Sequence, residues 1–454
     1  MLRRSSDTST LAQLPKVHLD AAGLDIGSTE IWAAVPADRD GESVRQFGTF
    51  TPDLQALADW LVACHIQTVA LESTGVYWIP IYEILEARGL EVRVVNAQHL
   101  KRVPGRKSDF ADCQWLQYLH TVGLLNGSFR PEGEMCVLRA YLRQRATLIE
   151  HRAAHILHMQ KALQQMNVQL TQVLSDITGV TGMAIIRAVV AGERDAVKLA
   201  QLRDKRCAHA EDEIAKALTG NYRAEHVFAL KQALALYDAY TQQIQDCDAA
   251  IEQQMQAMAD DNDDDLPPLD DTDKRNSHSK NGPSYDARTL LYRLAGVDLV
   301  AVTGLSALTV QTIISEVGLD MSRFPNEKHF CSWLGLAPHN DVSGGRVLRS
   351  RTLPTRSRAG QAFRLAAQSA SRSHDTEFGA YYRRIRGRLG PKQALVALAH
   401  KIARTVYYLL KHRTPFHDVG AMAFERSAKE RDIARLEKWA AKLGRQVVEI
   451  AAPT

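Results

Sequence analysis

Residues 22–35 read AGLDIGSTEIWAAV, and this stretch decides how the N-terminal part of the chain folds. Two apolar segments, Ala22–Ile26 and Ile31–Val35, flank a glycine–serine pair. Apolar segments separated by a short turn of small residues are typical of a β-hairpin. With a third strand expected at 44–50, the chain begins a sheet here and carries Asp25 at the end of its first strand.

The residues that follow alternate between helix and strand patterns. We expect helices at 53–63 and 79–87 and short strands at 68–71 and 92–95. Glu72 marks the end of the strand at 68–71. Two or three strands followed by βαβ steps predict a mixed sheet with flanking helices, and therefore an α/β fold.

Beyond this domain the sequence is mainly helical. Two long stretches, 136–174 and 229–258, contain few helix breakers and are typical of an antiparallel helical arm or coiled coil. A compact helical insert (179–221) separates them, and the Asp- and Pro-rich segment after them should be solvated and mobile. We divide the chain into a flexible N-terminus (1–20), an α/β domain (21–135), the helical arm with its insert (136–259), an acidic linker (260–285), a mainly helical second domain (286–415) and a helical tail (416–454).

The composition is that of an ordinary globular protein, with 45% hydrophobic and 24% charged residues. No apolar run approaches the roughly 20 residues that cross a bilayer, and the first residues lack the apolar segment of a secretory signal. The six cysteines are scattered and form no C-x-x-C pair, so neither a zinc finger nor a disulfide scaffold is expected. We therefore expect a soluble, cytoplasmic protein that does not bind membranes.

Positive charge is concentrated in residues 343–413. Thirteen arginines and three lysines face only Asp375 and Glu377, a local net charge of +14 in a chain whose total is +4. Because guanidinium groups bind phosphate oxygens bidentately, an arginine-rich stretch of this density favours contact with nucleic acid. A solvated helical face is the alternative. We expect phosphate contacts from seven arginines: Arg346, Arg349, Arg351, Arg356, Arg358, Arg383 and Arg384.

Four carboxylates stand at informative positions in the α/β domain. Asp25 and Glu72 each end a predicted strand, and Asp109 and Asp112 lie three residues apart at a predicted helix start, on one helical face. Carboxylates that converge at a sheet edge repel one another unless a hard cation such as Mg²⁺ neutralises them. Taken singly, these residues also suit a turn beside glycine or the first turn of a helix, where acids are favoured.

The segment Asp25–Thr29 also resembles the first phosphate loop of sugar kinases and actin-like ATPases. Those folds need a second Asp-x-Gly loop after a strand, and the candidate Asp418-Val419-Gly420 follows no predicted strand. A nucleotide-binding kinase is therefore disfavoured.

A serine opens the basic stretch in a loop that is rich in glycine. Ser343 precedes Gly344 and Gly345, which allow the backbone to approach a ligand closely. A serine hydroxyl among arginines is suited to attack a phosphodiester and form a covalent phosphoserine. The alternative is a turn serine that bonds to its own backbone. Ser332, Ser350 and Ser357 are weaker candidates because no glycine pair adjoins them.

These motifs, in this order, resemble the DEDD-type insertion-sequence transposases related to the Piv DNA invertases, a family also called bridge-RNA-guided recombinases. The resemblance covers most of the chain outside the helical middle, the acidic linker and the tail. It is carried by Gly23-Leu24-Asp25, 71–77, 107–112, 302–305, 333–338, Ser343-Gly344-Gly345, 358–360 and 401–404.

The resemblance implies a RuvC-like, RNase H-type fold for the first domain and a transposase activity that cuts and rejoins DNA. By position, the family's metal-binding acids fall on Asp25, Glu72, Asp109 and Asp112, and its nucleophile falls on Ser343. It further implies Mg²⁺ as cofactor, double-stranded DNA and a noncoding guide RNA as partners, and a homo-oligomer that is a dimer, or a tetramer on DNA. The alternative is a RuvC-like nuclease that resolves branched DNA without a covalent intermediate.

Overall fold

The computed structural model describes residues 14–72, 75–95, 109–125, 127, 130–131, 133–260, 266–269, 280–352 and 357–448, without the side chains of residues 109, 110 and 260. The chain forms two compact units, Met1–Arg130 and Pro131–Thr454, and each is described by itself. The boundary lies a few residues before the predicted one. Within the described ranges, no helix is both long enough and apolar enough to span a membrane.

The first unit contains a five-stranded mixed sheet. Its strand order is β3-β2-β1-β4-β5, with β1 and β2 and then β2 and β3 antiparallel, and with β1, β4 and β5 parallel. The predicted hairpin, third strand and βαβ steps are thereby confirmed. The strands are β1 (Ala21–Ile26), β2 (Glu30–Ala34), β3 (Val44–Gly48), β4 (Thr68–Glu72) and β5 (Glu91–Val95).

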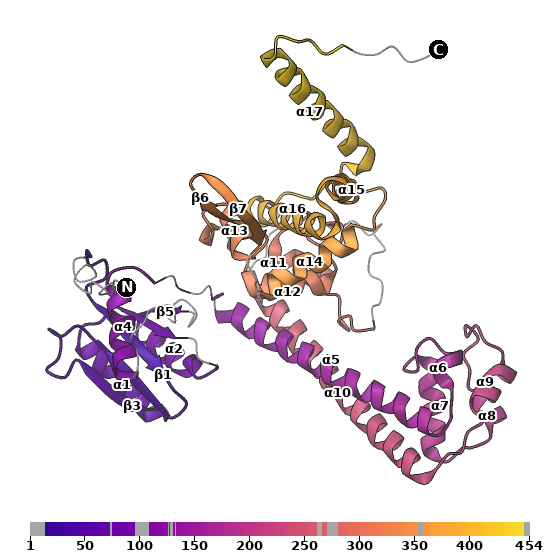
Figure 1. Ribbon diagram of the computed structural model, residues 1–454. Coiled ribbons are helices and arrows are strands. Elements are labelled where there is room, and N and C mark those ends of the chain that lie inside the picture. The colour runs from indigo at the N-terminus through magenta and orange to yellow at the C-terminus, as the bar shows by residue number, and fades with distance from the viewer. Residues whose placement is uncertain are drawn as a thin grey trace, which may run out of the picture. The chain divides into compact units, whose positions relative to one another are not determined.

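Helices cover both faces of this sheet (Figure 1). Helices α1 (Thr51–Ala63) and α2 (Trp78–Ala87) pack on the face that carries Leu24 and Leu71, whereas α4 (Asp109–Thr121) packs on the opposite face. Helix α1 begins where Pro52 fixes the backbone and Asp53 accepts a hydrogen bond from the Phe50 N–H. The central strands are therefore buried on both sides.

Two long helices dominate the beginning of the second unit. Helices α5 (Gly133–Gln165) and α10 (Ala224–Asp260) pack along their length. Arg145 of α5 contacts Asp248 of α10, and Arg152 of α5 contacts Thr241 of α10. Moving seven residues toward the C-terminus of α5 therefore corresponds to moving seven residues toward the N-terminus of α10. The two helices are therefore antiparallel, as the sequence predicted.

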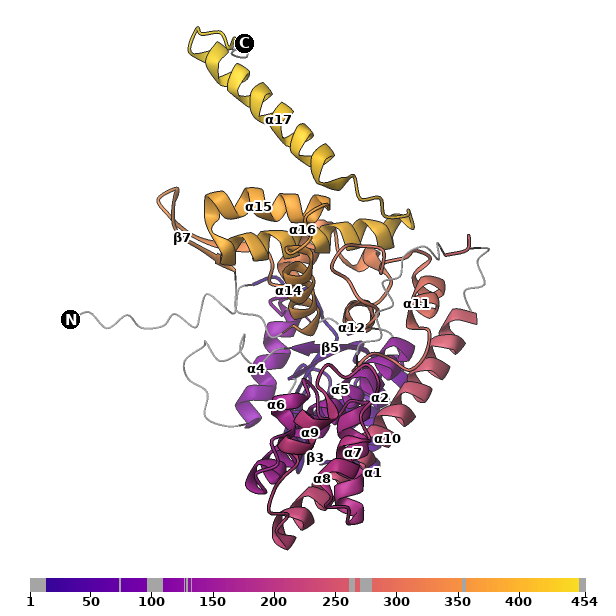
Figure 2. The same cartoon turned by 90° about the vertical axis from the view of Figure 1, so that its right-hand side faces the viewer.

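A small helical module joins the two long helices at one end (Figures 1 and 2). Its core contains Leu170, Ile185, Leu199 and Ile214, which are all fully buried. It consists of α6 (Leu170–Val173), α7 (Val180–Ala191), α8 (Ala196–Ala200) and α9 (Glu211–Ala217).

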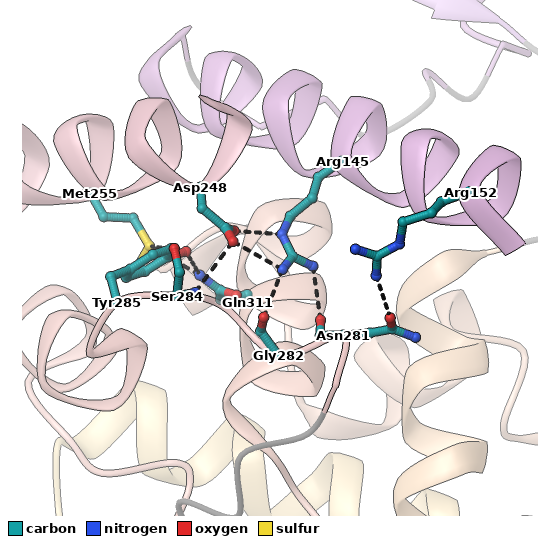
Figure 3. Close-up of polar contacts among 9 residues, drawn as sticks. All are labelled: Arg145, Arg152, Asp248, Met255, Asn281, Gly282, Ser284, Tyr285 and Gln311. Carbon is teal, nitrogen blue, oxygen red and sulfur yellow. Dashed lines mark hydrogen bonds and ion pairs between the residues drawn. The ribbon is translucent and has the colours of Figure 1, made fainter. Parts of the chain in front are cut away.

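The end of the predicted linker is anchored to these long helices. Figure 3 shows Arg145 between Asp248 and the carbonyl groups of Asn281 and Gly282, which accept hydrogen bonds of 3.1 and 2.9 Å. The expectation of a solvated, mobile linker is therefore wrong for residues 281–285. A buried guanidinium needs acceptors on all sides, and this segment supplies two of them.

The same network continues into the C-terminal domain. Gln311 donates a hydrogen bond to the Tyr285 hydroxyl, and the Ser284 N–H lies 3.3 Å from Asp248 (Figure 3). Arg143 adds a bidentate ion pair with Glu316, at 2.7 Å. The long helices and the C-terminal domain are therefore held together by polar and charged groups, among them the buried Asp248 and Gln311.

The C-terminal domain is a helical bundle with one exception. Phe330, Phe363 and Tyr407 meet in its core and are at most 1% exposed. The exception is an antiparallel hairpin of β6 (Pro338–Ser343) and β7 (Arg346–Thr352). The helical elements are α11 (Ala287–Ala295), α12 (Ala307–Val317), the short 3-10 helix η2 (Met321–Arg323), α13 (Glu327–Trp333), α14 (Arg358–Ala370), α15 (Glu377–Leu389), α16 (Pro391–His412) and α17 (Gly420–Lys442).

Candidate functional site

Asp25 and Glu72 leave the sheet side by side. Strands β1 and β4 are parallel and pair Gly23 with Ala70 and Leu24 with Leu71, so the next residues of the two strands are Asp25 and Glu72. Neighbouring strands lie about 4.8 Å apart, and side chains alternate between faces. Both carboxylates are half-buried and share a face of the sheet with Gly23 and Ala70.

Helix α4 covers that same face at very short range. A Cβ atom on Gly23 would lie 2.3 Å from the backbone nitrogen of Gln117 and 2.5 Å from the carbonyl oxygen of Cys113. The Gln117 side chain also donates a hydrogen bond to the Ala21 carbonyl, at 3.2 Å. The glycine therefore allows the helix backbone to rest directly on β1, beside Asp25.

Asp112 is half-buried on this helix, next to Cys113. Burial raises the pKa of the Cys113 thiol to about 12, and the negative charges of Asp25 and Asp112 add to that rise. Because α4 packs on the face of the sheet that carries Gly23 and Asp25, Asp112 lies on the same side of the sheet as Asp25. Asp109 precedes Asp112 by three residues on α4, but its side chain lies outside the described residues.

The donor set suits a hard divalent cation. Among the side chains that the structure describes, no three His, Cys, Asp or Glu residues are grouped closely enough to hold a metal ion. Asp109, the fourth predicted ligand, is not among these side chains. Carboxylates that share one face of a sheet are nevertheless the oxygen ligands that Mg²⁺ prefers, so the residues present fit the expected ion.

Ser343 lies in the second unit, in the β6–β7 hairpin. The sequence predicted a glycine-rich loop around this serine, and the structure instead places it as the last residue of a strand. Gly344 and Gly345 have φ angles of +55° and +76°, which suit the two-residue turn that joins twisted antiparallel strands. The glycine pair thus determines the hairpin, and it places Ser343 at an exposed position beside the turn.

A bulge in this hairpin aligns three arginines with the serine. The pairing shifts by one residue between Asp341 and Val342, which leaves Leu348 as the extra residue of β7. Because β6 has no extra residue, its alternation puts His339, Asp341 and Ser343 on one face. Their cross-strand partners on that face are Arg351, Arg349 and Arg346, respectively.

The other predicted arginines are placed differently. Arg358 is exposed at the start of α14, and Arg356 lies outside the described residues. Arg383 donates hydrogen bonds to the carbonyls of Ser373 and His374, at 3.1 and 2.9 Å, and Arg384 donates one to Asp432, at 2.6 Å. Arg383 and Arg384 therefore hold the fold together, and their guanidiniums are engaged within the chain.

The sequence reasoning missed basic residues in the tail helix. Arg431 and Arg435 of α17 line a pocket together with residues of α15 and α16. Their spacing of four residues places them on one helical face, which was visible in the sequence. The sequence did not show which helices that face would meet.

Two family models match separate parts of the chain, one of which contains the predicted acids and the other the predicted serine. A transposase model of the IS110 DEDD type matches residues 22–168, which include all four predicted acids. A model of the transposase IS116/IS110/IS902 family matches residues 297–383, which include Ser343. No curated protein matches the chain.

The matched domains define the class of this protein, which is an enzyme that recombines DNA. More particularly, the chain carries both transposase domains of the IS110 family and is a DNA transposase.

Proposed function

We propose that this transposase cuts and rejoins DNA through a covalent bond between Ser343 and a DNA phosphate. The observation that carries the proposal is the hairpin face on which Ser343 lies opposite Arg346, with Arg349 and Arg351 further along the same strand. Guanidinium groups in this arrangement are suited to stabilise charge on phosphate oxygens during transfer.

The proposed step exchanges one phosphodiester for another. The Ser343 oxygen bonds to phosphorus and loses its proton, while the phosphorus–oxygen bond to one DNA end breaks and the released DNA oxygen takes up a proton. Attack by the hydroxyl of a new DNA end on the phosphoserine reverses these changes and releases the serine. The bond energy is retained, so no nucleotide cofactor is needed.

The four acids complete the proposed site. We infer that the first unit is a RuvC-like, RNase H-type domain, which its strand order supports, and that Asp25, Glu72, Asp109 and Asp112 hold Mg²⁺. When bound, Mg²⁺ polarises the scissile phosphate and favours the serine alkoxide. Because these acids and Ser343 belong to different units of the chain, chemistry needs both.

We further propose that the transposase works in the cytoplasm as a dimer, or as a tetramer on DNA, with a noncoding RNA that specifies donor and target. The RNA rests on the family resemblance alone. Assembly through the long helices is supported by apolar side chains on their outer surface: Leu157 on α5 is 64% exposed, and Phe228 on α10 is 64% exposed.

A trapping experiment tests the serine directly. The protein is purified from its host with its co-purifying RNA, incubated with DNA of the element ends and Mg²⁺, and resolved on a denaturing gel. We expect a covalent protein–DNA adduct that maps to Ser343. Ser343→Ala should bind DNA without forming the adduct, and Asp25→Asn should also form none.

Ser350→Ala is the matched control, because Ser350 is exposed on the same hairpin but opposite Asn340, away from the arginine face. Adducts that persist in Ser343→Ala, or that map to Ser350 or Ser332, contradict the assignment. DNA cleavage by the wild type without any adduct would favour the nuclease alternative.

A further inference from the structure

Three helices enclose a pocket in the C-terminal domain that lies largely beyond the matched family segments. The pocket has a volume of about 400 Å³ and is lined by faces of α15, α16 and α17. Tyr381, Arg384 and Arg388 recur at helical spacing on α15, as do Arg431 and Arg435 on α17. The family match ends at residue 383, so most of this lining lies outside it.

The lining carries a large excess of positive charge. Six cations face a single carboxylate, that of Asp432. Hydrogen bonding from Arg384 is the largest cause of the lowered pKa of Asp432, and the charges of Arg384, Arg435 and Arg431 add to it. Asp432 is therefore ionised at neutral pH and still leaves a surplus of cations. The six are Arg384, Arg388, Lys401, Arg404, Arg431 and Arg435.

Two of these cations are part of the wall. Arg384 donates a hydrogen bond to Asp432, which ties α15 to α17. Lys401 of α16 forms an ion pair with Glu377, and its ammonium lies 4.8 Å from the ring centre of Tyr381 and 4.7 Å from that of Phe424. These contacts explain how three basic helix faces pack together despite their repulsion.

The other four guanidiniums are exposed and weakly compensated. Arg404 lies 3.7 Å from Glu327 and Arg435 lies 3.8 Å from Asp432, both longer than a hydrogen bond. Within the described part of the chain, no carboxylate lies within ion-pair distance of Arg388 or Arg431. Four accessible guanidiniums therefore converge from three helices on one pocket.

We propose that this pocket binds the phosphodiester backbone of a nucleic-acid strand. Each guanidinium can engage two phosphate oxygens, so four of them exceed what one phosphate accepts and match successive phosphates along a strand. The volume admits a phosphate with its sugar, whereas a duplex would lie across the opening. The identity of the partner as nucleic acid rests on the proposed function, while the site itself is separate from Ser343.

Paired double variants test the site. Arg388→Gln/Arg435→Gln removes two pocket charges, and Arg426→Gln/Lys438→Gln removes two exposed charges of α17 that do not line the pocket. Binding of labelled single-stranded RNA, single-stranded DNA and duplex DNA of one sequence is followed by fluorescence anisotropy over a salt series. All three proteins are compared by circular dichroism to show that the fold is intact.

We expect the pocket variant to bind about tenfold more weakly at low salt. The slope of log affinity against log salt should flatten by roughly 0.7 to 0.9 for each lost contact. The control variant should change neither quantity appreciably. Loss with one strand type identifies the source of the backbone, and equal loss with all three indicates a site that reads phosphates alone.

An unchanged slope in the pocket variant, or equal losses in the pocket and control variants, would overturn the inference. Failure of the proposed function would give a different result. In that case the wild-type protein would form no covalent adduct at Ser343, and the nucleic-acid binding of the pocket variant would not affect that outcome.

Discussion

The acid-bearing end of the sheet and the serine-bearing hairpin are built in opposite ways. In β1, Ala21, Ala22 and Leu24 are 0% exposed, and α4 rests on the strand at Gly23. In the hairpin, every residue of β6 is exposed, and so is every residue of β7 except the last. One set of candidate catalytic residues thus lies on a packed core, and the other lies on a solvent-exposed β-hairpin.

The difference shows that candidate catalytic side chains can be positioned in two ways, by the packing of the fold or by a bound ligand. A buried strand has its register fixed, because a slip of one residue would turn its apolar side chains to the wrong face. An isolated two-stranded hairpin is marginally stable in water. We therefore expect the acids to be set in place before DNA arrives, and Ser343 to be set by the glycine turn and by what binds the arginine face.

The largest expected effect comes from filling the space above Gly23. Gly23→Ala puts a Cβ within 2.3 Å of the α4 backbone, so the helix must move away from β1. We expect a loss of about 4 kcal/mol in the free energy of local unfolding, measured by amide hydrogen exchange of β1 and β4 in the full chain.

Gly41→Ala is the control, since a Cβ there meets nothing within 4 Å and its effect should stay within about 0.5 kcal/mol. Equal exchange in the two variants would show that α4 does not rest on β1 as described.

The second-largest expected effect is a dependence of the stability of the first unit on pH, caused by a buried histidine. Burial lowers the pKa of His120 to about 4, assisted by the charges of His18 and Arg93 and opposed by Glu91. The unfolded chain binds this proton near pH 6.5 and the folded chain does not. Stability therefore falls as the pH drops from about 6.5 to 4, by about 2 kcal/mol between pH 6.5 and 5.

Urea unfolding at several pH values measures this slope. His120→Gln should lose it, whereas His65→Asn, which replaces an exposed histidine, should keep it. A wild-type slope that survives in His120→Gln would assign the effect to another group.

The smallest expected effect comes from substitutions in the β6–β7 hairpin. Val342 and Val347 face each other across the hairpin and are 58% and 57% exposed. Replacing either with Thr should change the unfolding free energy by less than about 0.5 kcal/mol. The same change at Val69, which is 0% exposed in β4, should cost about 1–3 kcal/mol because it buries a hydroxyl. Similar costs at all three positions would remove the contrast between the two regions.

Local patterns predicted the elements of the first unit closely. The strand expected at 68–71 is β4 (Thr68–Glu72), and the helix expected at 79–87 is α2 (Trp78–Ala87). The hairpin was missed because its strands carry charged residues on one face and have no buried face, so their alternation resembled a loop. Its glycine pair was the correct signal, but we interpreted it as allowing close approach to a ligand and did not recognise the two-residue turn of a hairpin.

Long-range contacts account for the remaining differences. The sequence treated residues 281–285 as linker, yet Arg145 binds the carbonyls of two of them. It predicted phosphate contacts from Arg383 and Arg384, and it did not show that both also form hydrogen bonds within the fold. A guanidinium looks the same in the sequence whether its partner is a phosphate or a carbonyl from another helix.

The sequence by itself determined which residues have the chemistry for the proposed reaction: the acids at the strand ends, the serine before its glycines and the excess of arginine. These properties depend on the chemical nature of each side chain and on its neighbours in the sequence. They can therefore be recognised from a short segment of the chain. The tertiary structure decided that α4 brings Asp112 to the same side of the sheet as Asp25, and that Arg431 and Arg435 join the pocket of α15 and α16. Such choices depend on which surfaces bury each other, and burial is a property of the whole fold.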